Sequence, residues 1–404
     1  MPAVFAAGGR PLQGGSEKIK VGLVGCGGRG TGAPRGCVAS SAGVEIHPLG
    51  DVMPERVDRF RDNLAAAIGD AYKVSQERCF TGFDAYRQVL ATDIDLVILA
   101  TPPGFRPMMF EAAVAASKHV FMEKPVAVCP AGVRQVIAAG EAAAKKKLGV
   151  VAGTQRRHQP GYLATIARLR DGAIGDILSA RCYWNQGFLW SVERSPQLSD
   201  LEWQLRNWLY FTWLSGDHIV EQHIHNIDVI NWIMGGPPKV ARGMGGRQVR
   251  TDERFGHIFD HFSIEYEYAN GVKLQSLCRQ IDGTWRRVGE EVVGTKGHSD
   301  PAGWIRGENA WKFESEEGKK NPYMLEHRDL IASIRKGEPL NETRTVAEST
   351  LTAIIGRMSA YTGQPVDFAW ALNESKLDLR PDMLDFGMTL EVPPVAMPGS
   401  TPLI

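Results

Sequence analysis

The chain has 404 residues, a length that at about 150 residues per domain indicates two or three domains, with two as the preferred number. Lysine plus arginine and aspartate plus glutamate both total 46, so the formal net charge is zero, and no long run of one sign marks a surface for nucleic acid or anionic lipid. The longest apolar runs, such as residues 96–100, fall far short of the roughly 20 residues that cross a bilayer. Neither nucleic acid nor a membrane is therefore expected as a partner.

Six cysteines are spread along the chain without a CxxC pair, which favours buried free thiols over a zinc ribbon or a disulfide framework. Residues 1–17 are rich in Gly, Ala and Pro and are expected to form a flexible tail. The tail is compatible with the remnant of an export signal, which indicates the periplasm, or with a plain terminus, which indicates the cytoplasm. Localisation stays open between the two.

The first strand pattern leads into a glycine-rich turn. Residues 18–24 (KIKVGLV) form a short apolar run that enters the GxGxxG motif GCGGRG at residues 25–30. In a dinucleotide-binding turn the first glycine permits a tight bend, the second lets the backbone approach a pyrophosphate, and the third lets the helix pack on the strand. Pro34 and Gly36 weaken the helix that should follow. The cofactor is expected to contact Gly25, Gly27, Gly28, Arg29 and Gly30.

A second strand, over residues 44–49, ends at Gly50-Asp51, and Asp51 lies 21 residues after Gly30. An acidic side chain at this distance accepts hydrogen bonds from the adenosine ribose hydroxyls, which favours NAD over NADP. An ordinary turn residue at a strand end is the alternative for Asp51. Strand, turn and acid together predict a Rossmann domain over residues 18–150.

Two further buried strand runs, residues 95–100 and 119–122, end abruptly at TPP and EKP sequences. In an open parallel sheet, ligands bind beyond the carboxyl ends of the strands. Lys124, the lysine of EKP, is interpreted as facing the substrate, with a solvated turn charge as the alternative. The side chains expected to line the cofactor cleft here are Thr101, Pro102, Glu123 and Lys124.

These segments resemble the glucose-fructose oxidoreductase, inositol dehydrogenase and rhizopine-catabolism (Gfo/Idh/MocA) family. The resemblance rests on the glycine-rich start, the TPP loop followed by KHVFMEKP, and the segment from RRHQP to GAIGDI between residues 156 and 177. It implies a two-domain enzyme that moves hydride between a nicotinamide cofactor and a sugar or polyol. It also implies a homo-oligomer, a dimer or a tetramer.

After residue 150 the pattern changes to longer alternating strands, over residues 177–186 and 240–249 and in a hairpin over 261–279 with Asn270-Gly271 as its two-residue turn. The expected fold is α/β, with the Rossmann domain followed over residues 151–404 by an α+β domain on a large, mostly antiparallel open sheet. We assign substrate binding and oligomerisation to this second domain, because an uncovered sheet face is a natural oligomer surface.

A helix over residues 216–228 is expected to carry the chemistry. His218, Glu221, His225 and Asp228 recur at spacings of three and four and so share one face, whereas the histidine at 223 points away. A solvated face with scattered histidines is one alternative. A divalent metal bound by His218, Glu221 and His225 is another alternative. It is ranked below the catalytic interpretation because no further cluster of ligands accompanies these three residues. Asp228 is interpreted as structural, and no metal is predicted.

Removal of hydride from a secondary alcohol also requires removal of the hydroxyl proton, a step that a neutral imidazole suits near neutral pH. We assign it to His225, with Lys124 stabilising the developing alkoxide and Glu221 binding a neighbouring hydroxyl or orienting the imidazole. The resemblance supports this set, since the family's helix bears an acid, a His four residues on and an acid three beyond. The sequence departs from the family in having Glu221 for a common Asp, His223 for a common Gly and Arg106 for a common His.

Aromatic and basic side chains are concentrated between the Rossmann half and that helix. Trp stacks on sugar rings and Arg binds hydroxyls or carboxylates, although core packing is the commoner role of any one Trp. The substrate contacts expected in a sugar or glycoside pocket are Arg156, Arg157, Trp184, Arg206, Trp208, Glu221 and His225.

The sequence thus predicts an NAD-dependent oxidoreductase acting on a secondary alcohol of a sugar, sugar derivative or glycoside. The alternative is a redox-neutral NAD-dependent glycosidase that oxidises one ring carbon transiently, eliminates the aglycone and then reverses the oxidation. A non-catalytic nucleotide-binding regulator is the third reading, and the presence of Lys124 and His225 counts against it.

Overall fold

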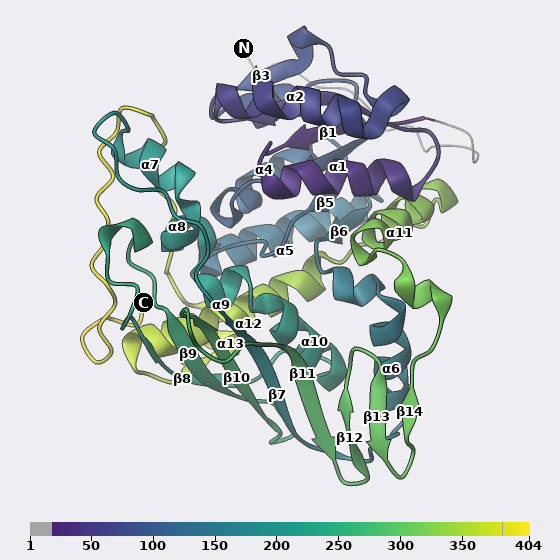
Figure 1. Ribbon diagram of the computed structural model, residues 1–404, viewed down its shortest axis with the longest axis vertical. Helices are drawn as coiled ribbons and strands as arrows, with labels where there is room; N and C mark the ends of the chain where they lie inside the picture. Colours follow the sequence, from purple (N-terminus) through teal and green to yellow (C-terminus); the bar gives the residue numbers. More distant parts are fainter. Residues whose placement is uncertain (1–17, 382) are drawn as a thin grey trace.

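The computed structural model describes residues 18–381 and 383–404 (Figure 1). The expected tail over residues 1–17 lies outside the described residues. The N-terminal sheet has six parallel strands in the order β3-β2-β1-β4-β5-β6, so the strand order reverses between β1 and β4, where such sheets bind ligands. Its strands are β1 (Ile19–Val24), β2 (Val44–Asp51), β3 (Cys79–Thr81), β4 (Leu96–Leu99), β5 (His119–Met122) and β6 (Val150–Ala152).

Helices cover both faces of this sheet, as a buried parallel sheet requires (Figure 1). The first helix forms despite Pro34 and Gly36, and Gly36 has a packing role, because a Cβ there would lie 3.1 Å from the Tyr323 carbonyl oxygen. Tyr323 belongs to a helix that returns from the C-terminal half and buries Leu330 against the sheet. The helices are α1 (Gly28–Ser40), α2 (Pro54–Ile68), α3 (Ala85–Leu90), α4 (Arg106–Ala115), α5 (Pro130–Lys145) and α11 (Pro322–Lys336).

The second sheet has nine strands in the order β14-β13-β12-β11-β7-β10-β9-β8-β15, and all neighbours are antiparallel except β7 and β10. The α/β class and the mostly antiparallel sheet are thereby confirmed. The strands are β7 (Ile177–Gln186), β8 (Val240–Gly246), β9 (His261–Glu267), β10 (Lys273–Gln280), β11 (Arg287–Gly294), β12 (Gly297–Asp300), β13 (Trp304–Gly307), β14 (Trp311–Lys312) and β15 (Val366–Asp367).

Two details of the expected strands are wrong. The strand expected to reach residue 249 ends at Gly246, because the next backbone N–H groups, of Gln248 and Val249, donate to the Asp260 carboxylate instead of a neighbouring strand. The hairpin has a three-residue loop, since the Tyr268 N–H bonds the Val272 carbonyl across residues 269–271. Its last residue, Gly271, has φ +83°, which explains the glycine.

The helix expected over residues 216–228 is interrupted. It forms as α9 (His218–Glu221) and α10 (Ile224–Met234). The Lys124 ammonium donates to the Glu221 carbonyl at 2.5 Å, and a continuous helix would use that carbonyl for the N–H of His225. At the break the His223 ring is buried and hydrogen-bonds the Ser276 hydroxyl at 2.7 Å, so His223 does point away from Glu221.

Helices lie on one face of the second sheet, and the longest of them, α12, runs between this sheet and α5 (Figure 1). The remaining helices are α6 (Pro160–Arg170), α7 (Asp200–Arg206), α8 (Thr212–Ser215), α12 (Thr343–Thr362) and α13 (Phe368–Asn373). The short 3-10 helices are η1 (Gly69–Ala71), η2 (Gln76–Arg78), η3 (Pro103–Phe105), η4 (Gln155–His158), η5 (Trp208–Tyr210), η6 (Glu253–Phe255) and η7 (Glu316–Lys319).

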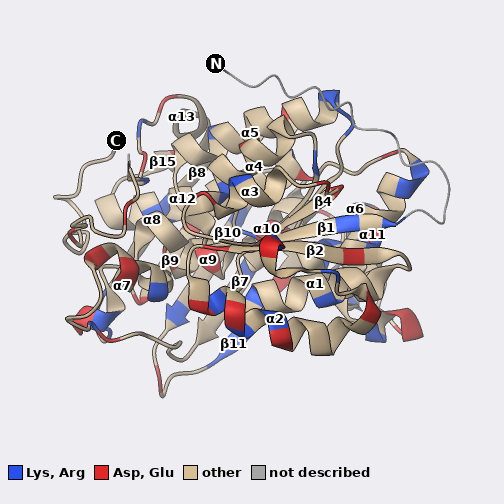
Figure 2. Cartoon of the chain, turned by 90° about the horizontal axis from the view of Figure 1, so that it is seen from above, with Lys and Arg blue, Asp and Glu red and all other residues tan. Residues whose placement is uncertain are grey.

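The two halves of the chain share interfaces beyond a simple linker. The boundary expected after residue 150 falls inside β6, and α11 of the second half packs on α1 of the first. The C-terminal segment, residues 374–381 and 383–404, returns along the second domain, and its Phe386 ring packs 4.8 Å from that of Phe83 in the first domain. Within residues 18–381 and 383–404, no helix has the length and apolar character needed to cross a bilayer. Figure 2 shows basic and acidic residues interspersed over the molecule.

Candidate active site

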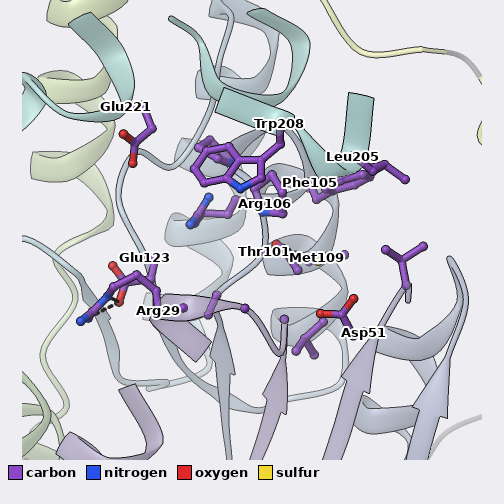
Figure 3. Close-up of a pocket in the computed structure, with 18 of the residues that line it drawn as sticks. Arg29, Asp51, Thr101, Phe105, Arg106, Met109, Glu123, Leu205, Trp208 and Glu221 are labelled. Atoms are coloured by element: carbon purple, nitrogen blue, oxygen red, sulfur yellow. Dashed lines mark hydrogen bonds and ion pairs between the residues drawn. The ribbon is translucent and has the colours of Figure 1, made fainter. Parts of the chain in front are cut away.

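A cavity of about 490 Å³ opens at the carboxyl ends of β1, β2, β4 and β5. Segments of the second domain, including α9, α10 and η5, form its opposite wall (Figure 3). The sequence-predicted residues that line it together are Gly25, Gly27, Gly28, Arg29, Asp51, Thr101, Pro102, Glu123, Lys124, Trp184, Trp208, Glu221 and His225.

The glycine turn after β1 is shaped for close approach by a ligand. Gly25 has φ +101°, and a Cβ there would lie 2.6 Å from the backbone of Ala100. Gly27 and Gly28 border the cavity, where a Cβ would meet no protein atom within 4 Å and would instead occupy cavity space. Gly30 does not line the cavity, because its Cα faces the turn, and a Cβ would lie 1.8 Å from the Gly25 carbonyl oxygen. The turn therefore fits a dinucleotide pyrophosphate at the start of α1.

Asp51 ends β2 and borders the same cavity. Its carboxylate accepts hydrogen bonds from the Cys26 N–H at 2.7 Å and the Met53 N–H at 2.9 Å, so it fixes the glycine turn as well as facing the ligand space. Burial raises the pKa of Asp51, while the two N–H groups and Arg56 act in the opposite direction. The residue fits the role of a ribose acceptor and has a structural role too.

Lys124 joins the two halves of the site. Its ammonium lies 3.1 Å from a carboxylate oxygen of Glu221 and also binds the Glu221 carbonyl. The expected substrate-facing position is compatible with its place on the cavity wall. The ion pair places a proton donor and an acceptor side by side where the first domain meets α9.

His225 lies one turn beyond this pair, 8% exposed, with its ring stacked 5.8 Å from that of Trp184. Burial, and then the positive charge of Lys124, hold the pKa of His225 well below its usual value of 6.5. The imidazole is therefore neutral near pH 7 and able to accept a proton. No hydrogen bond joins its ring nitrogens to another residue of the described chain, and His225 lines the cavity.

Glu123 holds the end of β5 to α1. Its carboxylate accepts from the Arg29 Nε at 2.9 Å, as the dashed lines in Figure 3 show. Gly153 makes room for it, since a Cβ at that position would lie 2.3 Å from a Glu123 oxygen. Glu123 and Arg29 thus form a fixed pair at the floor of the cavity.

Three arginines expected to bind substrate do not line the cavity, because carboxylates of the chain itself hold them elsewhere. Arg156 pairs with the buried Glu290. Arg157 forms two hydrogen bonds with Asp228, at 2.8 and 2.9 Å, which gives Asp228 the structural role expected of it. Arg206 pairs with Glu202 at 2.9 Å and with Glu55 of α2 at 2.6 Å. Their expected substrate contacts are corrected on this ground.

The alternative metal site does not assemble. His218 hydrogen-bonds Asp217 at 2.9 Å, and its ring packs 5.1 Å from that of Phe262, away from His225. Among the residues that the structure describes, no three His, Cys, Asp or Glu side chains are grouped so as to hold a metal ion.

Several cavity residues carried no recognisable sequence signal. Phe105 follows the TPP loop, and Leu384 comes from the C-terminal segment, far along the chain from the motifs. Only the TPP loop could have drawn attention to Phe105. Arg106 was noted as a departure from the family pattern, without a role in the site. The remaining lining residues of this kind include Arg56, Phe83, Tyr86, Met109, Leu189, Trp190, Leu205, Gln222 and Tyr323.

The glycine turn, Asp51, Lys124 and His225 border one cavity of a parallel α/β sheet, an arrangement typical of dinucleotide-binding oxidoreductases. Residues 19–153 match the family described as "Oxidoreductase family, NAD-binding Rossmann fold", and residues 162–299 match the "GFO/IDH/MocA C-terminal domain". The chain belongs to the GFO/IDH/MocA family of oxidoreductases.

Known proteins agree with this membership. An inositol 2-dehydrogenase of Acidothermus cellulolyticus is 27% identical over 285 residues, 70% of this chain and 72% of that protein. One of Serratia proteamaculans is 27% identical over 256 residues, covering 63% of this chain and 66% of its own length. An aldose-aldose oxidoreductase from Caulobacter crescentus, solved with glycerol, shares the fold with a TM-score of 0.68 at 20% identity, over 87% of this chain and 99% of that one. A levoglucosan dehydrogenase complexed with NADH and levoglucosan shares the fold with a TM-score of 0.67 at 19% identity, over 87% of this chain and 99% of that one.

Proposed function

We propose that the chain is an NAD-dependent oxidoreductase that transfers hydride between the nicotinamide and a secondary alcohol of a sugar, sugar derivative or glycoside. One observation carries the proposal: Lys124, Glu221 and His225 border the same cavity as the glycine turn of a dinucleotide-binding sheet. The inositol and sugar dehydrogenases among its relatives support the substrate class.

In this proposal NAD, when bound, accepts the hydride, and the protein handles the proton and the geometry. His225 takes the hydroxyl proton, for which its neutral state near pH 7 suits it. Lys124 donates a hydrogen bond to the same oxygen and stabilises its developing negative charge. Glu221, already paired with Lys124, orients the ammonium and is placed to accept a hydrogen bond from a neighbouring hydroxyl.

NAD rather than NADP is proposed from Asp51. Its carboxylate borders the cavity at the end of β2, where it would accept from ribose hydroxyls and repel a 2′-phosphate. Arg56 on the same wall is the feature that favours NADP, and the carboxylate of Asp51 interacts with it.

The direct test is the absorbance of reduced nicotinamide while sugars, sugar acids, polyols and aryl glycosides are added one at a time to the protein with NAD. A sustained rise supports a dehydrogenase and names the substrate class. His225→Asn should lower kcat at least about 100-fold, the usual contribution of a general base. His298→Asn, in the distant strand β12, is the matched control. Full activity of His225→Asn would refute the assignment.

A redox-neutral glycosidase is the second candidate, favoured by the indole rings of Trp184, Trp190 and Trp208 on the cavity wall. Such rings suit a glycoside with a flat aglycone. Release of an aglycone from an aryl glycoside without a net rise in reduced nicotinamide would support it over the dehydrogenase.

We further propose a homo-oligomer that pairs through the face of the second sheet opposite its helices. Across four strands this face carries Met244, Ser263, Leu277 and Tyr183, with Met244 74% exposed and Trp285 packed edge-on against Tyr183. Sedimentation equilibrium should give a dimer or tetramer mass.

For the compartment, the periplasm is proposed from residues 1–17 alone, with the cytoplasm as the alternative.

A further inference from the structure

Arg106 is a buried cation on the cavity wall, and it forms no ion pair with the residues that the structure describes. It is the first residue of α4 and lies between Trp208 and the Thr101 end of β4 (Figure 3). The residue is 3% exposed, and its Nε and Nη1 have no hydrogen-bond partner among the described residues. Unpaired guanidinium groups are seldom buried, because removal of a charge from water is costly unless an anion compensates it.

The two carboxylates whose charges act on Arg106 already have other partners. Glu123 and Glu221 both act on its charge, but Glu123 is bound by Arg29 and Glu221 by Lys124. Burial lowers the pKa of Arg106 to about 10, so the group still carries its charge at neutral pH. Among the described residues, no carboxylate therefore pairs with the Arg106 guanidinium as Glu123 pairs with Arg29 and Glu221 with Lys124.

The position of Arg106 in α4 adds a second cost. The N-terminus of a helix carries a partial positive charge and favours acidic side chains, whereas the first turn of α4 contains none and begins with this arginine. Both costs are offset if an anionic group of a ligand lies against the guanidinium. Phe105 and Trp208 line the same wall of the cavity, and apolar surroundings of this kind strengthen such a contact.

We propose that Arg106 binds a carboxylate of the substrate, so that the preferred substrates are sugar acids rather than neutral sugars. The inference rests on the proposed dehydrogenase function and names its substrate class. A planar carboxylate matches the fork of a guanidinium, and charge-assisted pairs of this kind are among the stronger hydrogen bonds of proteins. The cofactor's pyrophosphate has its own cradle at Gly27 and Gly28, on a different element of the cavity.

A bound carboxylate would also fix which carbon reacts. Arg106 lies on α4 of the first domain, whereas His225 lies on α10 of the second, so a sugar acid held by both spans the cavity between the domains. Two fixed ends restrict the substrate to one orientation against Lys124 and thereby raise the fraction of productive complexes.

The experiment compares hexuronates and aldonates with the neutral sugars of the same configuration, in the intact chain with NAD. The wild type should show kcat/KM at least about 10-fold higher for an acid than for its neutral counterpart. Arg106→Gln should lower kcat/KM for the acid about 30-fold or more, the range expected on losing a charged pair, and change the neutral sugar by less than about 3-fold. Arg106→Lys, which keeps the charge without the fork, should fall between.

Arg56→Gln is the matched control, since Arg56 borders the cavity beside Asp51 and should leave the ratio of acid to neutral sugar unchanged. NAD affinity, read from tryptophan fluorescence, should be retained in Arg106→Gln and shows that the variant is folded. Equal losses for acids and neutral sugars, or no preference for acids in the wild type, would overturn the inference. The inference would also be overturned if Arg106→Gln lost NAD affinity but kept the preference for acids, because the anion that Arg106 binds would then belong to the cofactor.

Measurements of binding distinguish a failure of this inference from a failure of the proposed function. Thermal shift with NAD and each sugar acid reports binding without turnover. Stabilisation by an acid that disappears in Arg106→Gln, in the absence of any turnover, would refute the dehydrogenase and keep the anion site. Turnover of neutral sugars that is independent of Arg106 would keep the dehydrogenase and refute the anion site.

Discussion

Single residues of this site serve both the fold and the ligand, and Asp51 is the clearest case. Its carboxylate binds two backbone N–H groups of the chain and borders the cavity. Arg29 and Glu123 likewise pair with each other while facing the ligand space. A substitution at such a position changes the shape of the site as well as its chemistry, so its test needs a readout that distinguishes the two.

Asp51→Asn provides that readout through the ratio of the two cofactors. Loss of the negative charge removes the repulsion of a 2′-phosphate and leaves Arg56 free to attract it, so the preference for NAD over NADP should fall at least about 10-fold. Damage to the turn alone would weaken both cofactors equally and leave the ratio unchanged, which would refute the ribose assignment. Dissociation constants from quenching of tryptophan fluorescence measure the ratio, with Asp58→Asn on the exposed face of α2 as the control.

At the scale of elements, the C-terminal segment closes one end of the cavity. Leu384 lines the cavity, Phe386 packs on Phe83 between β3 and α3, and the Leu390 carbonyl accepts from the Gln204 side chain on α7 at 2.7 Å. The segment thus connects the two domains at the side where Asp51 borders the cavity.

Phe386→Ala should therefore weaken NAD binding about 3- to 10-fold, because removing the ring loosens the segment over that end of the cavity. The turnover number with saturating NAD should stay within about 2-fold, since Phe386 contacts none of the proposed catalytic groups. Titration of NAD against tryptophan fluorescence measures the effect. Met397→Ala, 62% exposed on the same segment, is the control, and an equal change in both variants would contradict a specific role of the Phe386 contact.

Local sequence patterns predicted the elements whose geometry is set locally. The glycine turn and the EKP strand end were found because spacing and residue type alone specify them. The break between α9 and α10 was missed because it depends on Lys124, nearly a hundred residues away. Arg206 was assigned to substrate because nothing in the sequence shows that Glu55 is its partner. Ion pairs between distant segments, and the course of the C-terminal segment, depend on tertiary packing that periodicity does not encode.

For the whole molecule, buried neutral histidines set how stability depends on pH. Burial lowers the pKa of His119 and His257 to about 4 and that of His223 and His327 to about 3. The unfolded chain binds protons at these groups near pH 6.5, whereas the folded chain does not. Their contribution to stability is therefore fully present above about pH 6.5 and is lost as the pH falls towards 4 and 3.

His158 acts in the opposite direction. Burial alone would lower its pKa, but Asp329 and Glu342 raise it to about 10. Its contribution is present below about pH 6.5 and is lost as the pH rises through 10. One raised histidine against five lowered ones, with His225 as the fifth, leaves a net loss of stability in acid.

The free energy of unfolding should consequently fall between about pH 7.5 and pH 5, by up to about 2 kcal/mol for each lowered imidazole. His327→Leu removes one of them at a site where the ring lies 4.0 Å from that of Phe121, so an apolar side chain can replace it. The fall between the two pH values should then be smaller in His327→Leu than in the wild type, as measured by urea denaturation at both. His298→Leu in β12 controls for the substitution itself. If the free energy of unfolding falls as much in His327→Leu as in the wild type, this histidine takes up its proton in the folded state. Its burial would then not govern the loss of stability in acid.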